Sequence, residues 1–406
     1  EMKAAASMGL MFNTDSLSVD MEKTQEWKAG IVKRLTGGIA GLFKANGVDH
    51  MLGTVEFISA KELKVVGPEG EQRITCDKLV LAVGSRPREI ANFSYEDPEV
   101  LDSTKALDLQ EVPARLAVIG GGYIGLEMGM MLAKLNAEVT VIEFADSVLA
   151  AFDPQVVREI KKKMKKLGMK TLTGAAAQDW ERTEDGIVVR VKQGDELIEV
   201  PADKVLVTVG RVPNSEQLAP LGLELDRGFV VVNEQQQTSV PDVYAIGDIT
   251  GRTMLAHGAT YEGELAAEVI AGHDYRQYAA RTVPAVVFTD PEIATAGLQE
   301  HEATAKGYPV KVGKMPFAAV GRAMTTNTTD GFIKVVLDER DDRVLGITIV
   351  GPNASDLISE AALAVELDAD AHDLGYTIHP HPTLGEGVME AAKHAVGEAI
   401  HIANKR

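Results

Sequence analysis

The spacing of hydrophobic residues changes along the chain, and each change predicts a different element. Over residues 1–45 apolar side chains recur every three or four positions, which predicts a helix with a stripe of Trp27, Ile31, Leu35, Ile39 and Leu42. From Val48 to Val83 the period shortens to that of strands, with turn signals at residues 67–70. The predicted strands are Val55–Ile58, Leu63–Val66 and Leu79–Val83.

The middle of the chain alternates strands and helices. From Leu116 to Val209 this alternation is typical of a doubly wound parallel sheet. Residues 156–168 place apolar side chains on one helical face and lysines on the other, so we expect a solvated basic face rather than a binding patch. A further helix is predicted at Tyr261–Ala271. From about Val283 strands precede helices, as in a separate α+β domain.

Two stretches of the sequence echo each other. Cys76–Pro87 and Ala202–Pro213 share an Asp-Lys pair, a short apolar run, a Val-Gly step and a proline. Two domains of one architecture, each ending a strand at a glycine beside a ligand crevice, would produce this echo. Two unrelated buried strands that end in turns are the alternative.

Composition narrows the classes of function. Lys and Arg number 41 against 60 Asp and Glu, a net charge of −19, which argues against nucleic acid or anionic lipid as the main partner. No apolar run reaches the ~18 residues of a membrane helix, so no membrane partner is expected. Cys76 is the single cysteine, which excludes a disulfide framework and a redox-active dithiol within these 406 residues.

The strongest chemical motif is a glycine turn between a strand and a helix. Leu116–Ile119 leads into a GxGxxG sequence at residues 120–125, and a helix follows to about Leu135. Gly120 permits the tight turn, Gly122 lets the backbone approach a pyrophosphate, and Gly125 lets the helix pack on the strand. Glu143 ends the next strand, Val139–Ile142, where a carboxylate can bind both ribose hydroxyls and repels a 2′-phosphate, which favours NAD over NADP.

Two further motifs lie at predicted strand and helix ends. Gly247-Asp248 follows the predicted strand Val243–Ile246, so Asp248 either faces a crevice or caps the next turn. In the HPHPTLGE sequence, Thr383 and Glu386 fit a capping box for the last helix. Glu386 also lies close enough to His381 to orient an imidazole as a general base. Metal binding by His379, His381 and Glu386 is a weaker alternative, and no metal is expected.

Together these motifs resemble the flavoprotein disulfide reductases that bind two dinucleotides, and within them the branch that oxidises dihydrolipoamide. The matching sequences, in the family's order along the whole chain, are LVLAVGSRP, VIGGGYIGLE, VTVIE, VTVGRVPN, VYAIGD, MLAHGATYEG, VFTDPEIATAG and HPHPTLGE. The resemblance implies an α/β fold of two Rossmann-like domains, the first truncated, and a carboxy-terminal α+β dimerisation domain. The implied segments are residues 1–112 (rest of the FAD-binding domain and a connector), 113–213 (NAD-binding), 214–283 (second part of the FAD-binding or central domain) and 284–406 (dimerisation).

The resemblance also implies roles for individual residues. Asp248 would bind the ribityl and diphosphate region of FAD, and Glu127 would lie near the meeting point of flavin and nicotinamide. His381 would accept the substrate thiol's proton while Glu386 holds its tautomer. The implied FAD residues are Gly53, Ser85, Asp248, Met254, Leu255, Ala256 and His257, and the implied NAD residues are Gly120, Gly121, Gly122, Tyr123, Ile124, Gly125, Glu127, Glu143, Ala177 and Gly210.

The implied partners are a second copy of the chain, whose disulfide His381 would serve, and the lipoyl domain of a 2-oxo acid dehydrogenase or glycine cleavage complex. The implied compartment is the cytoplasm in a bacterium or the mitochondrial matrix in a eukaryote. Three other classes of the family fit this sequence less well. Glutathione-type reductases prefer NADP and are expected to have arginine in place of Glu143. Mercuric reductases end in a cysteine pair, and soluble transhydrogenases lack the base that serves the dithiol. Another reductase of this family or a non-catalytic NAD-binding remnant are the alternatives.

One departure from the family pattern is large. The family begins with a first GxGxxG turn for FAD, a Cys-x4-Cys dithiol and a lysine on the next helix, and none of these occurs in the 406 residues. We therefore expect that about 60 amino-terminal residues of the pattern are missing. We also expect that the 406 residues alone are inactive and bind FAD poorly.

Overall fold

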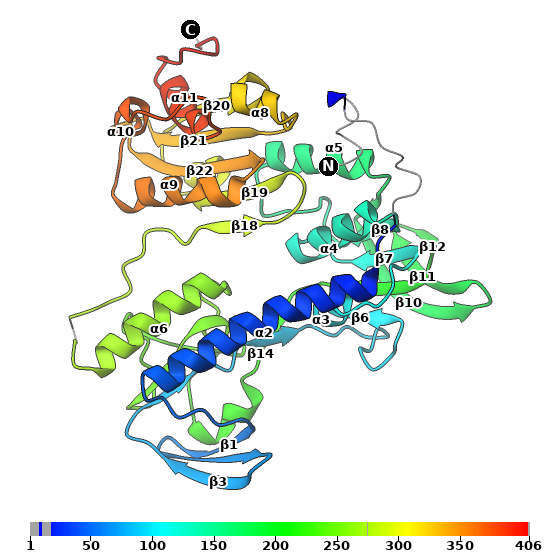
Figure 1. Cartoon of the computed structure of the whole chain (residues 1–406), viewed down its shortest axis with the longest axis vertical. Coiled ribbons are helices and arrows are strands. Elements are labelled where there is room, and N and C mark those ends of the chain that lie inside the picture. Colours follow the sequence, from blue (N-terminus) through cyan, green and yellow to red (C-terminus); the bar gives the residue numbers. More distant parts are fainter. Residues whose placement is uncertain (1–7, 10–17, 274, 405–406) are drawn as a thin grey trace. The chain divides into compact units, whose positions relative to one another are not determined.

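The computed structural model describes residues 8–9, 18–273 and 275–404, which form two compact units (Figure 1). The first unit contains residues 8–9, 18–21, 89–209 and 281–404, and the second contains residues 22–88 and 210–280 apart from 274.

A five-stranded parallel sheet forms one part of the first unit. Its spatial order places β13 and β7 at the centre, and their side chains are almost entirely buried. The order is β6 (Val100–Leu101), β13 (Lys204–Val207), β7 (Arg115–Ile119), β8 (Glu138–Glu143) and β9 (Lys170–Thr173). The helices of this part are α3 (Ser103–Leu107), α4 (Tyr123–Lys134) and α5 (Pro154–Lys166). The predicted doubly wound pattern is therefore confirmed.

Helix α5 shows how local sequence sets an element. Asp153 accepts a hydrogen bond from the Gln155 amide, and Pro154 occupies the first helical position, where its missing N–H costs nothing. The apolar face is buried and the lysines lie mainly on the other side. A three-stranded antiparallel sheet completes this part, with β10 (Ala175–Thr183), β11 (Gly186–Gln193) and β12 (Glu196–Ala202).

The carboxy-terminal part of the first unit is an antiparallel sheet with helices. Both central strands are buried along their whole length, because helices pack on this sheet. The order is β18 (Ala285–Val287), β19 (Glu292–Gly297), β22 (Val344–Gly351), β21 (Phe332–Asp338) and β20 (Val310–Pro316). The helices are α7 (Glu300–Ala305), η5 (Phe317–Ala319), α8 (Gly321–Thr325), α9 (Ala354–Glu366), α10 (Ala371–Tyr376) and α11 (Glu386–Ala395).

The second unit contains shorter strands and two long helices. Strand β4 (Leu79–Leu81) pairs in parallel with β17 (Val243–Ala245), and β5 (Ser85–Pro87) pairs with β14 (Arg211–Pro213). The ends of the two echoing sequences are thus hydrogen-bonded to each other. The remaining elements are α2 (Met21–Ala45), β1 (Thr54–Ser59), β2 (Glu62–Gly67), β3 (Gly70–Thr75), η3 (Glu216–Leu221), β15 (Leu225–Asp226), β16 (Phe229–Val230), η4 (Gly247–Thr250) and α6 (Ala256–Ile270).

Three predicted boundaries need correction. The first helix begins at Met21, residues 18–20 are not helical, and residues 1–7 and 10–17 lie outside the described residues. Strand β4 ends at Leu81, earlier than predicted. Helix α6 begins at Ala256 rather than Tyr261, because Gly258 is a packing glycine inside the helix, where a Cβ would overlap the Thr253 hydroxyl. No helix in the described part of the chain is long and apolar enough to cross a membrane.

Candidate functional site

The turn between β7 and α4 has the backbone geometry that its glycines predict. Gly120 adopts a φ of +104°, a conformation that favours glycine, and a Cβ on Gly125 would overlap the Gly120 carbonyl oxygen. A Cβ on Gly122 would meet nothing within 4 Å. Gly122 is also the extended residue that begins α4 without a side-chain cap. Gly120 and Gly125 are therefore required by the backbone of the turn and its packing. The space beside Gly122, at the amino end of the helix, is open to a ligand.

Glu143 is held beside this turn. It is the last residue of β8, and its Oε2 accepts a 2.6 Å hydrogen bond from the Gly121 amide while Oε1 accepts a 2.7 Å bond from the Ala145 amide. Two backbone amides thus fix the carboxylate at the edge where the strands end. Recognition of an adenosine ribose by Glu143 stays a prediction, and the position at the end of β8 is the one that it requires.

The other predicted NAD residues lie in different settings. Tyr123 and Ile124 open α4, and Glu127 follows one turn later, where its Oε1 accepts a 2.7 Å bond from the Phe288 amide. Burial raises the pKa of Glu127 above its ordinary value. Ala177 lies on β10 and packs, partly buried, against a hydrophobic core cluster of the first unit. The Gly210 carbonyl accepts a hydrogen bond from the Arg88 amide.

In the second unit, Ser85 and Asp248 meet although they are far apart in sequence. The Ser85 hydroxyl donates a 2.5 Å hydrogen bond to Asp248 Oδ2, so Asp248 does not use this oxygen to cap a turn. Arg211 Nε donates to the Ser85 hydroxyl at 2.6 Å, and its other nitrogen donates to the Ser85 carbonyl at 2.7 Å. Sequence reasoning missed Arg211, although it occupies the position of Ser85 in the second copy of the echo.

Among the remaining predicted FAD residues, backbone packing alone accounts for the glycine at position 53. Gly53 precedes β1, and a Cβ there would lie 2.6 Å from the Val66 carbonyl oxygen. Met254 has a φ of +51°, a strained conformation for a side chain of this kind, and Leu255 to His257 form the start of α6.

Two buried polar side chains adjoin the carboxyl end of β17. Glu262 of α6 is buried, and its Oε2 accepts a 2.6 Å hydrogen bond from the Gly247 amide, next to Asp248. Glu262 Oε1 and both side-chain atoms of buried Gln236 have no hydrogen-bond partner among the described residues. Burial raises the pKa of Glu262. A glutamate at a buried helical position among apolar residues was the signal that could have found it.

In the carboxy-terminal part, His381 and Glu386 form the predicted pair. His381 Nδ1 and Glu386 Oε1 are 2.8 Å apart, and the His381 side chain is 77% exposed. The carboxylate orients the ring through Nδ1 and leaves Nε2 without a hydrogen bond to the described residues. Burial acts to raise the pKa of Glu386, but hydrogen bonds from the Thr383 amide and His381 outweigh it and lower the pKa.

The capping box predicted at Thr383 is only half formed. Glu386 Oε2 accepts a 2.8 Å bond from the Thr383 amide, but the Thr383 hydroxyl donates to the Pro380 carbonyl, and α11 begins at Glu386 after Gly385. One glutamate therefore serves the histidine and the loop with different oxygens.

His379 has a structural role in contrast to His381. Its Nε2 is 2.7 Å from Glu360 Oε1 and its Nδ1 is 2.8 Å from the Thr377 carbonyl, so both ring nitrogens are used. The hydrogen bond with Glu360, which sequence reasoning missed, raises the pKa of His379.

These features define a class of protein. A parallel sheet with an open glycine turn and a strand-end carboxylate is a dinucleotide-binding domain, and an exposed imidazole oriented by a carboxylate is a group that transfers protons. Together they indicate a nucleotide-dependent oxidoreductase.

Comparison with known proteins identifies the family. The pyridine nucleotide-disulphide oxidoreductase family matches residues 4–263, and the dimerisation domain of that family matches residues 283–392. The chain belongs to this family. It is an NAD-dependent flavoprotein oxidoreductase, and the cofactors of the family are FAD and NAD.

Individual relatives match nearly the whole chain. A dihydrolipoyl dehydrogenase of Geobacillus stearothermophilus is 46% identical over 409 residues, which span 100% of this chain and 86% of that protein. One of Bacillus subtilis (strain 168) is 44% identical, covering 98% of this chain and 85% of that protein. The crystal structure of LpdA from Mycobacterium tuberculosis has a TM-score of 0.88 and 26% sequence identity, covering 97% of this chain and 86% of that chain.

The described residues fit the two cofactors to different degrees. The open Gly122 and the fixed Glu143 carboxylate suit NAD. Ser85, Asp248 and the start of α6 suit one end of FAD, and the unpartnered atoms of Glu262 and Gln236 lie close to the same strand end. However, the described part of the chain has one glycine turn between a parallel strand and a helix, and it belongs to the NAD side.

Proposed function

We propose that this chain provides the NAD-binding, dimerisation and proton-accepting parts of a dihydrolipoyl dehydrogenase. The observation that carries the proposal is the 2.8 Å pair of His381 and Glu386 with its exposed ring. The Geobacillus relative of that name supports it by matching the chain from end to end. The proposed assembly is a homodimer, and the proposed substrate is dihydrolipoamide on a lipoyl domain.

The reaction oxidises two thiols to a disulfide and reduces NAD⁺ to NADH, with release of one proton. FAD, which Ser85, Asp248 and the start of α6 would help to hold, would supply the two-electron transfer between the enzyme's disulfide centre and NAD. His381 Nε2 would take the proton of the attacking substrate thiol, because a thiolate is the nucleophile in thiol–disulfide exchange. The charge that forms on the ring would be stabilised by Glu386.

The disulfide needed for this reaction cannot form within the 406 residues, which contain Cys76 alone. Cys76 adjoins the core of the second unit, as expected of an inert thiol. We propose that a segment with a Cys-x4-Cys pair and a flavin-binding turn completes the enzyme. The 406 residues alone are then inactive.

The test substitutes His381 in an extended chain. The extension supplies the two parts of the family pattern that the 406 residues do not contain, a first GxGxxG turn and a Cys-x4-Cys pair. His381→Gln should lower kcat/KM for dihydrolipoamide oxidation by about 10²–10⁴-fold, the usual contribution of a general base. Transfer of electrons from NADH to a dye should be unaffected, because it needs no thiol deprotonation. His379→Gln removes structural hydrogen bonds near the same loop, so it is the control that shows what disturbance of the loop alone costs. Equal loss of both activities in His381→Gln would show that His381 is not the proton acceptor for the substrate thiol.

The single cysteine favours a second candidate, a non-catalytic NAD-binding protein. This candidate predicts that the extended chain, even with bound flavin, oxidises no dithiol.

A further inference from the structure

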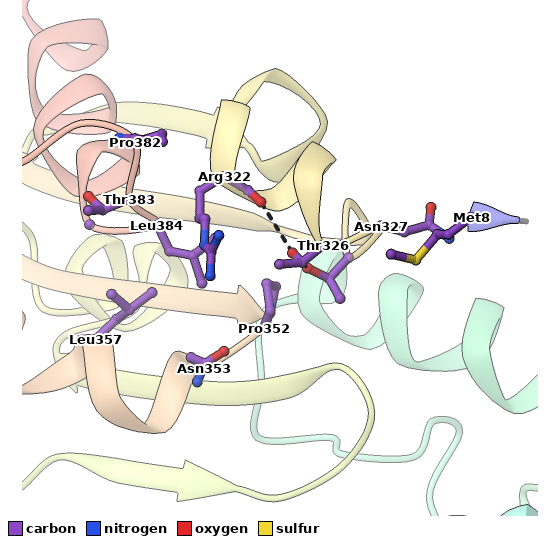
Figure 2. Close-up of a pocket in the computed structure, with 12 residues that line it drawn as sticks. Met8, Arg322, Thr326, Asn327, Pro352, Asn353, Leu357, Pro382, Thr383 and Leu384 are labelled. Atoms are coloured by element: carbon purple, nitrogen blue, oxygen red, sulfur yellow. Dashed lines mark hydrogen bonds between the residues drawn. The ribbon is translucent and has the colours of Figure 1, made fainter. Parts of the chain in front are cut away.

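The carboxy-terminal part of the first unit has two features that its sheet alone does not explain. One is a pocket of about 850 Å³ (Figure 2), whose wall includes residues 382–385 and which therefore belongs to the histidine loop described above. The other is a lysine inside the sheet. The side chain of Lys334, on β21, is 1% exposed, although an ammonium group is costly to bury unless it is paired.

The partners of Lys334 lie on two different parts of the unit. Its Nζ donates a 2.5 Å hydrogen bond to Asp153 Oδ2 and another to Glu300 of α7. Asp153 is itself buried, and it caps the start of α5 in the parallel-sheet part. Burial acts to raise the pKa of Asp153, but hydrogen bonds from Lys334 and from the Gln155 amide outweigh it and lower the pKa. A buried ion pair therefore joins the two parts.

A second side chain from the carboxy-terminal part holds the same point of the chain. Gln299, which is also buried, accepts a 2.9 Å hydrogen bond from the Asp153 amide and donates a 3.2 Å bond to the Ala151 carbonyl. Together with the bond from Lys334, these contacts hold residues 151–153 from outside the parallel-sheet part.

The segment held in this way is the end of the loop from Glu143 to Asp153, which connects β8 to α5. In the middle of the loop, the Leu149 amide donates a 2.9 Å hydrogen bond to the Gly121 carbonyl of the glycine turn. Leu149 has a φ of +49°, a conformation that persists only where the surroundings impose it. A Cβ on Gly121 would lie 2.7 Å from Val148, so the loop and the turn are in contact.

The choice of a lysine at this position is informative, because an apolar side chain would also dock the two parts. Phe332 lies on the same face of β21 and already packs in the core cluster that contains Val148 and Leu149. A buried ion pair adds little stability relative to apolar packing, but it is directional. Lys334 therefore specifies the position of Asp153 more than it strengthens the docking.

We propose that Lys334 is a positioning residue for NAD. By holding Asp153, it sets the loop that supports the glycine turn at Gly121 and that starts at the Glu143 carboxylate. The dinucleotide site of the parallel sheet is then complete only when the carboxy-terminal part is docked on it. The inference rests on the proposed NAD-binding function of this turn.

The test measures NADH binding by the 406-residue chain through nicotinamide fluorescence, and hydrogen exchange by mass spectrometry. Lys334→Met removes the charge from a long, unbranched side chain. It should raise the Kd for NADH at least about tenfold, because a displaced loop no longer holds the turn in place. Amides of residues 144–153 should exchange faster, whereas those of β10, β11 and β12 should not change.

Two further variants separate positioning from loss of charge. Lys166→Met removes an exposed ion pair with Asp330 that also joins the two parts, and it should leave both the Kd and the loop exchange unchanged. Lys334→Met combined with Asp153→Asn removes both charges of the buried pair and keeps a helix-capping side chain. The raised Kd should persist in this double variant, which also carries the test if Lys334→Met alone does not fold.

Three results would overturn the proposal: an unchanged Kd in Lys334→Met, a raised Kd without faster exchange of residues 144–153, or recovery of the original Kd in the double variant. The last result would mean that Lys334 only neutralises Asp153. Failure of the unaltered chain to bind NADH would contradict the NAD-binding function itself, and the inference with it, so the two failures are distinguishable.

Discussion

Strands β4 and β13 arise from nearly the same sequence but have different surroundings. β13 is hydrogen-bonded on both edges, to β7 and β6, whereas β4 is hydrogen-bonded to β17 alone among the strands that the structure describes. The echo aligns Val80 with Leu206. Leu206 is 0% exposed, because it lies in the main hydrophobic core of the first unit, while Val80 is 40% exposed.

This difference shows that the local sequence determines whether a strand forms, whereas the elements packed around the strand determine how far its side chains are buried. The Asp-Lys, apolar and Val-Gly sequence forms a strand in both places, with or without the second neighbour. At β13 the second neighbour is β7, which leads into the glycine turn. The free edge of β4 and its exposed Val80 therefore support the proposal that a further strand, glycine turn and helix complete the flavin side.

The aligned pair Leu206 and Val80 gives the largest expected effect. Leu206→Ala should lower the free energy of unfolding by about 2–5 kcal/mol, because it leaves a cavity in the sheet core. Val80→Ala should cost less than about 1 kcal/mol in the 406-residue chain and more in the extended chain, where Val80 becomes covered. Urea unfolding measures both. An equal cost of Val80→Ala in the two chains would contradict the account of β4.

The second prediction contrasts two glycines of one turn. Gly125→Ala should destabilise the first unit by about 1–3 kcal/mol, because the new Cβ overlaps the Gly120 carbonyl. Gly122→Ala should leave stability within about 0.5 kcal/mol, since its Cβ meets nothing, but should weaken NADH binding at least about tenfold if the pyrophosphate approaches there. Calorimetric titration and thermal unfolding distinguish the two. Full NADH affinity in Gly122→Ala would place the pyrophosphate elsewhere.

The smallest expected effect concerns pH and the buried carboxyl of the second unit. The pKa of Glu262 is raised by burial, so its stabilising contribution is present below the ordinary glutamate pKa and is lost as pH rises through the folded value. Glu262→Gln keeps an acceptor for the Gly247 amide and does not titrate. The Tm of this variant relative to the unaltered chain should therefore rise between pH 4 and pH 8. The exposed Glu264→Gln is the control. A difference in Tm that is constant with pH would exclude a raised pKa.

The sequence predicted the elements whose determinants are local. The glycine turn, Glu143 at the end of β8, the buried face of α5 and the His381–Glu386 pair all follow from spacing along one segment. Contacts between distant segments could not be predicted in the same way. Arg211 reaches Ser85, Glu262 reaches Gly247 and Glu360 reaches His379 only after folding. The start of α6 was missed because Gly258, taken as a boundary, is required by packing against Thr253.

The central claim is that these 406 residues contain the whole NAD-binding part but only a portion of the FAD-binding part, and that they lack the cysteine pair of the disulfide. Its most direct test is parallel titration of the 406-residue chain and the extended chain with NADH and with FAD, followed by absorbance. We predict that both chains bind NADH and that only the extended chain binds FAD stoichiometrically. A stoichiometric flavin spectrum from the 406 residues alone, or no NADH binding by them, would contradict the account.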